Sequence, residues 1–374
     1  MDLTPRGADR APSTLIRVAV LFLLLLFALP VAAQEETPDA AKIAEWKAEA
    51  ENRPLFRTDS VLTFTLVANF NEISKDRDTL STKEHWGEVR MAGDGGAELK
   101  LPVQLRTRGH FRLNRRNCSF VPLRLNFRTR EMRGTVFEGQ DKLKLVTHCN
   151  SNDLYDEYVL REYVLYRVHN LITPRSFRAR LTKVTYVDSA SGKTLETRNG
   201  ILLEHEDDVA KRMEGRIVEI RGAYFADVDA TQLTEVALWE YFVGNTDWSL
   251  IALHNIRLVM SWASGTIYPI AYDFDFSGLM NTRYATPDPR LGIRSVRERL
   301  YRGPCRTMAD YQPHLAKYLE NEQAILQLYQ TFPGLDGRYR TDSQRFLKEF
   351  FDFLRRPRDV ENVLVATCKR QPSV

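Results

Sequence analysis

"DLYDEYVLREYVLYRVHNLI", residues 153–172, is the stretch where the spacing of apolar residues changes along this chain. Within it, apolar side chains recur every three or four residues, and Pro174 follows shortly after. This spacing places the apolar side chains on one face of an α-helix, and proline cannot continue a helix. The stretch therefore predicts a helix that separates two regions of different structure.

The region before this helix alternates apolar and polar residues with a period of two. The alternation is found in four segments, residues 61–70, 97–107, 121–127 and 142–146. Such alternation is typical of β-strands with one buried and one solvated face. It predicts an antiparallel sheet in the first part of the chain.

Strands and helices both follow residue 172. Residues 178–188 and 199–207 read as strands joined by the turn "DSASGK", and residues 230–244 read as a helix capped by Asp229 and ended by Gly244. "HNIRLVMSW" and "TIYPIAYDF" then predict a hairpin around residues 263–265, and the chain from residue 309 reads as helices. We therefore predict an α+β fold with a sheet-rich N-terminal part and a helical C-terminal part.

The N-terminus resembles an export signal. Three arginines precede the apolar run "VAVLFLLLLFALPVAA", which ends in small residues, and this pattern predicts a signal peptide over residues 1–33, cut after Ala33. The alternative is an uncleaved membrane anchor, but Pro30 interrupts the run. We therefore expect an exported protein, periplasmic or extracellular, with no membrane span after cleavage and a leader helix or loose tail over residues 34–55.

Charge and cysteine content restrict the partners and the compartment. The chain beyond Ala33 carries a net charge of +3, which does not favour nucleic acid as a partner. Its four cysteines permit two disulfides in an oxidising compartment, and three pairings are open. We favour the pairs of neighbours, Cys118 with Cys149 and Cys305 with Cys368. No CxxC pair indicates zinc.

Two arginine-rich segments leave alternatives open. "RTRGHFRLNRR", residues 106–116, fits a solvated strand end better than an anion site. In "GIRSVRERLYRGPC", residues 292–305, the arginines at 294, 297, 299 and 302 fit pairing with local acids or an anion clamp near the candidate site described next. The distance to that site decides between these accounts.

Two carboxylates, Asp273 and Asp275, follow an apolar run in "IYPIAYDFDFSGL", residues 267–279. If the strand continues through them, both point to the same face, where they repel each other unless a cation lies between them. Oxygen ligands suit Mg²⁺, Mn²⁺ or Ca²⁺. A buried structural pair of carboxylates is the alternative.

A second group of polar residues, "GNTDWSLIALHNIRL", lies at 244–258, directly after the predicted helix. An acid in a loop after a helix, then an Asn, a hairpin and a metal-binding Asp is the order of parts used in phosphoryl transfer. In that order Asp247 positions or deprotonates the acceptor hydroxyl, Asn255 holds a divalent ion, and Asp273 with Asp275 holds the ions that bridge the phosphates. His254 reads as a packed or surface histidine.

Residues 100–280 resemble the CotH-like atypical kinases, a family of secreted or spore-coat proteins distantly related to protein and lipid kinases. The resemblance lies in "RTRGHF", "VPLRLNF", "DEYVLREYVLYRV", "NGILLEHEDD", "GNTDW" with "HN", and "YDFDFSG". It implies a protein-kinase-like two-lobe fold in one domain over residues 56–374, with an N-lobe to about 205 and a C-lobe from about 206.

The same resemblance implies further site residues. It gives Asp247 as the catalytic residue, Asp273, Asp275 and Asn255 as metal ligands, and Glu204 near the adenine. Arg161 matches the family's Asp-to-Arg spacing in the helix. Arg124, Lys142 and Lys144 are candidates for the cation that pairs the phosphates. Two departures stand out: eight residues separate Asp247 from Asn255 where the usual kinase loop has five, and no GxGxxG loop is present.

We therefore expect an exported kinase that transfers phosphate from ATP or another nucleotide to protein Ser or Thr with Mg²⁺ or Mn²⁺. Because little ATP is found outside the cytoplasmic membrane, a non-catalytic module that binds an envelope partner protein is the first alternative. A DxD glycosyltransferase is the second, although the strand order does not alternate with helices as its fold requires.

Overall fold

The computed structural model describes residues 37–93 and 96–368. The predicted signal peptide therefore lies outside the described residues. Within them, no helix is both long and apolar enough to cross a membrane.

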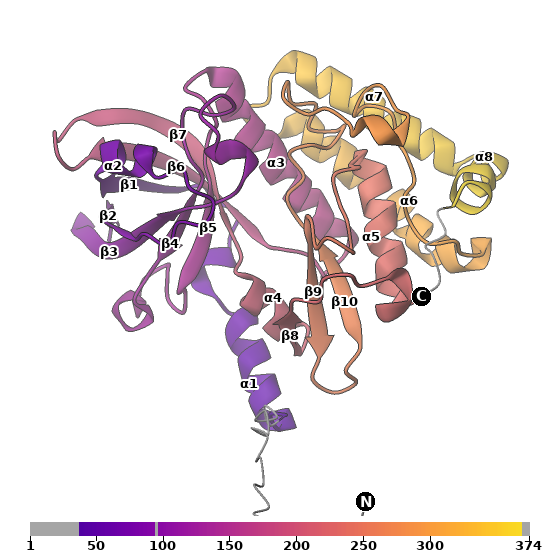
Figure 1. Ribbon diagram of the computed structural model, residues 1–374, viewed down its shortest axis with the longest axis horizontal. Helices are drawn as coiled ribbons and strands as arrows, with labels where there is room; N and C mark the ends of the chain where they lie inside the picture. The colour runs from indigo at the N-terminus through magenta and orange to yellow at the C-terminus, as the bar shows by residue number, and fades with distance from the viewer. Residues whose placement is uncertain (1–36, 94–95, 369–374) are drawn as a thin grey trace, which may run out of the picture. The chain divides into compact units, whose positions relative to one another are not determined.

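Seven strands form a closed barrel (Figure 1). Their order around it is β1-β2-β3-β4-β5-β7-β6. Every neighbouring pair is antiparallel except β1 and β6, whose parallel pairing of Leu62 with Thr182 through Ala68 with Asp188 closes the ring. The strands are β1 Leu62–Ala68, β2 His85–Ala92, β3 Glu98–Thr107, β4 Leu123–Asn126, β5 Lys142–Val146, β6 Ala179–Asp188 and β7 Thr194–Leu203.

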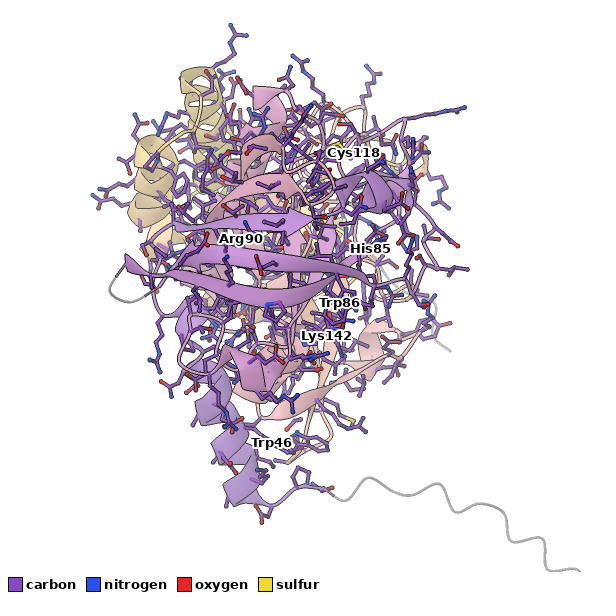
Figure 2. The ribbon with its side chains drawn as sticks, turned by 90° about the vertical axis from the view of Figure 1, so that its left-hand side faces the viewer. Trp46, His85, Trp86, Arg90, Cys118 and Lys142 are labelled. Carbon is purple, nitrogen blue, oxygen red and sulfur yellow. A yellow bond between two sulfur atoms is a disulfide. The ribbon has the colours of Figure 1, made fainter. Side chains whose placement is uncertain are left out.

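This closure shows that the predicted protein-kinase two-lobe fold is wrong. Strand β1 pairs with both β2 and β6, so the barrel closes where a kinase N-lobe has an open sheet. The alternation in the sequence identifies strands but does not say which strand borders which, because the β1–β6 pairing joins segments more than a hundred residues apart. Figure 2 shows the barrel from its side, with Trp86 and Arg90 of β2 labelled.

A second, smaller sheet and a set of helices make up the rest of the chain. The sheet has the order β10-β9-β8 and is antiparallel. Its strands are β8 Gly215–Val218, β9 Ile256–Ser261 and β10 Ile267–Ala271. The helices are α1 Ala40–Glu51, α2 Phe70–Lys75, α3 Asp153–Ile172, α4 Glu206–Arg212, α5 Ala230–Val243, α6 Met308–Thr331, α7 Gly337–Leu354 and α8 Pro357–Glu361, followed by a π-helical turn Asn362–Ala366.

Helix α3 connects the barrel to the helical part. It packs against β6 and β7 on one side and against α6 on the other. Its buried face belongs to a large core shared with α5, α6, α7, β9 and β10, whereas a separate core fills the barrel. Residues that α3 presents toward β10 are therefore held rigidly between two packed regions.

Two disulfides confirm the predicted pairing. Cys118 is bonded to Cys149, beside the end of β5, and Cys305 to Cys368, which ties the chain before α6 to the segment after the π-helical turn. Neither bond joins residues adjacent in sequence, so each restrains a long loop of the unfolded chain.

Candidate functional site

The acid segment, residues 273–280, follows strand β10 but does not continue it. The strand ends at Ala271, and Asp273 has a φ of +64°, in the left-handed region. Asp273 and Asp275 are therefore not alternate residues of an extended strand, and the predicted extended geometry is wrong. The backbone N–H of Asp273 donates to the Tyr166 hydroxyl of α3 at 3.1 Å, and this contact fixes the turn.

The loop that carries Asp247 is attached to the acid segment. Helix α5 ends at Gly244, whose φ of +68° suits a left-handed cap. The backbone N–H groups of Gly278 and Leu279 donate to the carbonyls of Gly244 and Val243, at 3.0 and 2.9 Å. Two segments some thirty residues apart in sequence thus lie side by side.

Both oxygens of the Asp247 carboxylate have partners. Oδ1 lies 3.1 Å from Nε2 of His254, and Oδ2 accepts from the Asn255 side-chain amide at 3.2 Å. The same amide donates to the Asp247 carbonyl at 2.6 Å. Asn255 therefore orients Asp247 and has its nitrogen turned toward it.

Several residues of these two segments have strained backbone conformations. Of the five non-glycine residues with positive φ in the described chain, Leu253, Asn255 and Asp273 belong to the two segments just described. Such conformations cost free energy and are concentrated at functional sites, where the surrounding structure enforces them.

Glu162 of α3 adds a carboxylate that sequence reasoning missed. It is almost fully buried, and no hydrogen bond or ion pair to its carboxylate is found among the described residues. Burial raises its pKa well above the usual value, and the charges of Asp273 and Asp275 raise it further. The sequence signal was a lone Glu in line with Tyr158 and Tyr166 on the buried helix face.

Asp275 belongs to the same group of acids. Its low-dielectric surroundings, followed by the charge of Asp273, raise its pKa to about 7, while the Tyr284 hydroxyl donates to Oδ2 at 3.1 Å. The pKa of His254 is raised first by its hydrogen bond to Asp247 and also by the charges of Asp273 and Asp275. Four carboxylates, on Glu162, Asp247, Asp273 and Asp275, thus act on one another.

A group of cations lies on neighbouring strands of the barrel. Arg124 of β4 stands opposite both Arg106 and Lys144 in the strand register, so three cations form a row across β3, β4 and β5. Like charges directly opposite each other destabilise a sheet. The Arg124 guanidinium has no hydrogen bond or ion pair within the described ranges, which leaves it available to an anion.

Lys144 is buried and paired. Its ammonium lies 2.9 Å from Glu206 and 4.9 Å from the ring centre of Tyr272, the residue before Asp273. Burial lowers the pKa of Lys144 to about 8. Burial would raise the pKa of Glu206, but Lys144 and Arg257 outweigh that effect and lower it to about 2.

Three predicted site residues lie in other surroundings. Lys142 is half exposed and 3.6 Å from Asp141. Arg161 is buried, bonded to Glu157 and the Met280 carbonyl, and stacked 3.8 Å from the ring centre of Tyr339. Glu204 is fully buried, and both its oxygens accept from Arg178 and Arg212.

Three arginines of residues 292–305 donate hydrogen bonds to backbone carbonyls around the site. Arg297 donates to the Gly278 carbonyl, Arg299 to the Phe242 carbonyl, and Arg302 to the carbonyls of Thr246 and Trp248. These contacts fix the acid segment and the Asp247 loop from behind. Arg299 also lies 4.0 Å from a Glu349 oxygen, so the pairing with local acids expected for this cluster is found for one of its arginines.

Two carboxylates of this site fit metal binding shared with a phosphate ligand. In the part of the chain that the structure covers, no three His, Cys, Asp or Glu side chains are arranged to hold a metal ion by themselves. Mg²⁺ commonly binds one or two carboxylates and completes its shell with water and substrate phosphates. Because the carboxylates of Asp273 and Glu162 have no hydrogen-bond donor in the described chain, they fit such a role.

Comparisons with known proteins add no family. Neither the family models nor the curated proteins that were searched match this chain. The resemblance to CotH-like kinases therefore stays a prediction.

Proposed function

We propose that this chain is an exported, metal-dependent phosphotransferase that moves a phosphate group from a nucleotide to Ser or Thr of a protein, as its resemblance to CotH-like kinases implies. The proposal rests on the site and not on the fold. The observation that carries it is the gathering of Glu162, Asp247, Asp273 and Asp275, from three separate segments, together with the buried Lys144, which lies against Tyr272 next to Asp273, and the unpaired Arg124 opposite Lys144.

Each group has a role in this proposal. Asp273 and Asp275, with Glu162 behind them, would hold Mg²⁺ or Mn²⁺, which when bound offsets the negative charge of the phosphates. Arg124 and Lys144 would bind phosphate oxygens, and Asp247 would orient the acceptor hydroxyl and take its proton. Asn255 and His254 hold the Asp247 carboxylate in one orientation for that task.

Export is the second part of the proposal. The two disulfides support an oxidising compartment, periplasmic or extracellular, because such bonds persist mainly there. Protein substrates would then be found among exported or envelope proteins.

One observation favours a non-catalytic binding module instead. Both oxygens of Asp247 already accept contacts, and Glu206 holds the Lys144 ammonium at 2.9 Å. A site with these groups engaged binds an anionic or phosphorylated partner without turning it over.

The test uses residues 34–374 with both disulfides intact. We expect ATP with Mn²⁺ to raise the melting temperature, because a ligand that binds only the folded state stabilises it, and to label a protein acceptor with the γ-phosphate. Asp273→Ala should abolish both effects. Asp247→Ala should keep the thermal shift and lower transfer by at least about 100-fold.

Asp352→Ala, on an exposed position of α7, serves as the control and should change neither result. A thermal shift without transfer to any acceptor would select the binding module. A folded protein that shows no shift with any nucleotide and metal would contradict the proposed activity.

A further inference from the structure

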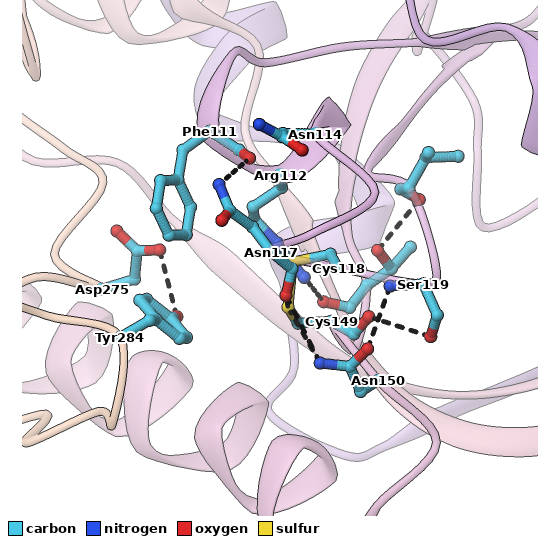
Figure 3. The surroundings of a disulfide bond; sticks show 12 residues. Phe111, Arg112, Asn114, Asn117, Cys118, Ser119, Cys149, Asn150, Asp275 and Tyr284 are labelled. Atoms are coloured by element: carbon cyan, nitrogen blue, oxygen red, sulfur yellow. Dashed lines mark hydrogen bonds between the residues drawn. A yellow bond between two sulfur atoms is a disulfide. The ribbon is translucent and has the colours of Figure 1, made fainter.

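The loop between β3 and β4, residues 108–120, is held in place by several independent contacts. The Cys118–Cys149 disulfide ties its end to the chain after β5, and Arg77 donates to the carbonyls of Leu113 and Cys118, at 3.2 and 2.8 Å. Figure 3 shows this loop facing Asp275 and Tyr284. It is therefore a fixed part of the site rather than a freely solvated strand end.

Phe111 joins the loop to the acid segment. Its ring centre lies 5.2 Å from that of Phe276 in an edge-on arrangement and 5.5 Å from that of Tyr284, whose hydroxyl donates to Asp275. Aromatic contacts of this kind fix relative position as well as burying surface. The residues on either side of Phe111 are thus held near the carboxylates.

Two arginines of this loop, Arg108 and Arg112, lack the partners that buried guanidinium groups usually have. In both, Nε is buried without a hydrogen bond, and neither arginine forms an ion pair with an acid of the described chain. Arg112 donates only to the Thr147 carbonyl, and the Arg108 side chain donates to nothing. Polar groups withdrawn from water are normally satisfied, so these donors need an acceptor.

The same arginines lie close to acids that they do not touch. Burial and the charges of Asp273 and Asp275 raise the pKa of Glu162, and Arg112 and Arg108 oppose that rise. Arg112, Glu162 and Tyr284 line one cavity of about 10 Å³, which has room for no more than a water molecule, so a larger ligand has to bind beside it. Opposite charges thus lie near each other without forming an ion pair.

A species that carries both signs of charge would satisfy both the arginines and the carboxylates. A phosphate group offers oxygens to the guanidinium forks, while a cation bound to that phosphate offers positive charge to the carboxylates. Direct arginine–carboxylate pairs would instead have filled the site with protein groups alone.

We propose that Arg108 and Arg112 form a subsite that binds a phosphate group on the side of loop 108–120 that faces the acid segment. The nucleotide assignment of this subsite rests on the proposed function, but phosphate binding by the two arginines does not. The ligands it takes are di- and triphosphates, whose adjacent phosphate groups reach both arginines.

The test measures binding of inorganic pyrophosphate, as its Mg²⁺ complex, to residues 34–374 by calorimetry. We expect saturable binding that weakens at least about 10-fold in Arg108→Met, a variant that loses no hydrogen bond present in the structure. Arg112→Met should weaken binding similarly, and Arg112→Lys should weaken it less because the charge remains. Arg116→Met removes an exposed charge of the same loop and should leave affinity within about twofold.

Absence of pyrophosphate binding in the folded parent chain would overturn the inference. So would an equal loss of affinity in Arg116→Met, because that result indicates diffuse attraction to a basic loop. The two proposals fail separately. Pyrophosphate binding that depends on Arg108, in a chain that transfers no phosphate, leaves the subsite and removes the activity, whereas undiminished nucleotide-dependent transfer by Arg108→Met removes the subsite alone.

The disulfide provides a second measurement on the same loop. Cys118→Ser with Cys149→Ser should weaken pyrophosphate binding several-fold, because the loop must then be ordered by the ligand. The double variant Cys305→Ser with Cys368→Ser is the matched control and should bind as the parent does. Equal affinity in both double variants would overturn the role of the closed loop.

Discussion

Asp275 is a partly buried carboxyl whose charged form destabilises the folded protein unless a cation binds beside it. Its pKa is about 7 when folded and near 3.8 when exposed, so the folded chain binds the proton more tightly than the unfolded chain does. The contribution of this group to the free energy of unfolding is therefore fully present below about pH 4 and is lost as pH rises through 7.

Asp275→Asn should consequently stabilise the metal-free protein at pH 8, by about 2 kcal/mol once solvent screening is allowed for, and should change little at pH 4. Melting temperatures in EDTA across this range check the result. Asp288→Asn is the control, because hydrogen bonds from Arg290 hold the pKa of this exposed carboxyl at about 2, and it should give no gain at pH 8. Equal stability of Asp275→Asn and the parent at pH 8 would contradict a raised pKa of Asp275 in the folded protein.

The surroundings of Glu204 indicate a structural role, whereas the sequence resemblance placed it near the adenine. Its carboxylate is fully buried and accepts from the backbone N–H and guanidinium of Arg178 and from Arg212, at 2.7 to 2.9 Å. Removing one partner of a buried ion pair typically costs 3–5 kcal/mol.

We therefore expect Glu204→Ala to lower the free energy of unfolding by about 3 kcal/mol without any nucleotide present, as chemical denaturation would measure. Asp352→Ala breaks a surface pair with Arg355 and should cost less than about 1 kcal/mol. If Glu204 held adenine instead, its variant would keep parental stability and lose affinity for ATP.

At the scale of elements, arginines of residues 292–305 hold the loops of the candidate site in place through their backbone carbonyls. Arg302 donates to the carbonyls on both sides of Asp247, those of Thr246 and Trp248. It touches no proposed ligand, so it acts as a positioning residue. Its effect should appear in the loop's order and in turnover rather than in nucleotide affinity.

Arg302→Met should speed amide hydrogen exchange in residues 245–250 and lower the proposed transfer rate about 10-fold, while the nucleotide's KM stays within about twofold. Arg290→Met, which removes only an exposed pair with Asp288, is the comparison variant. Unchanged exchange in this loop would show that Arg302 does not hold it.

Element positions were predictable where local pattern and caps agree. The helix at Asp153–Ile172 and the strand at Lys142–Val146 were predicted to the residue, and helix α5 begins after Asp229 and ends at Gly244 as predicted. Strand β2 was missed because Gly87 and charged residues interrupt its alternation. The extended form of Asp273 was wrong because Tyr166, far away in sequence, holds a left-handed turn that no local signal indicates.

At the scale of the whole molecule, the sequence did not reveal that the N-terminal sheet closes into a barrel. Every strand of the barrel has two neighbours, but alternation alone fits an open sheet equally well. The site was likewise predictable only in part. Asp247, Asp273 and Asp275 were found by their order in the chain. Glu162, Arg108 and Arg112 join them only through the packing of α3 and of loop 108–120, whose end a disulfide holds.

Barrel closure makes a prediction that an open sheet does not. In a strand with neighbours on both sides, successive backbone N–H groups all donate, whereas in an edge strand every second N–H faces solvent. Thr65, Leu66 and Val67 of β1 are registered against both β2 and β6. All three amides should therefore exchange slowly, near the rate set by global unfolding, when followed by NMR in deuterated water. Strand β8 lies at an edge of the small sheet and should show alternating fast and slow amides. Rapid exchange at Leu66 beside protected Thr65 and Val67, or the converse, would mean that β1 has a free edge and that the barrel is open in solution.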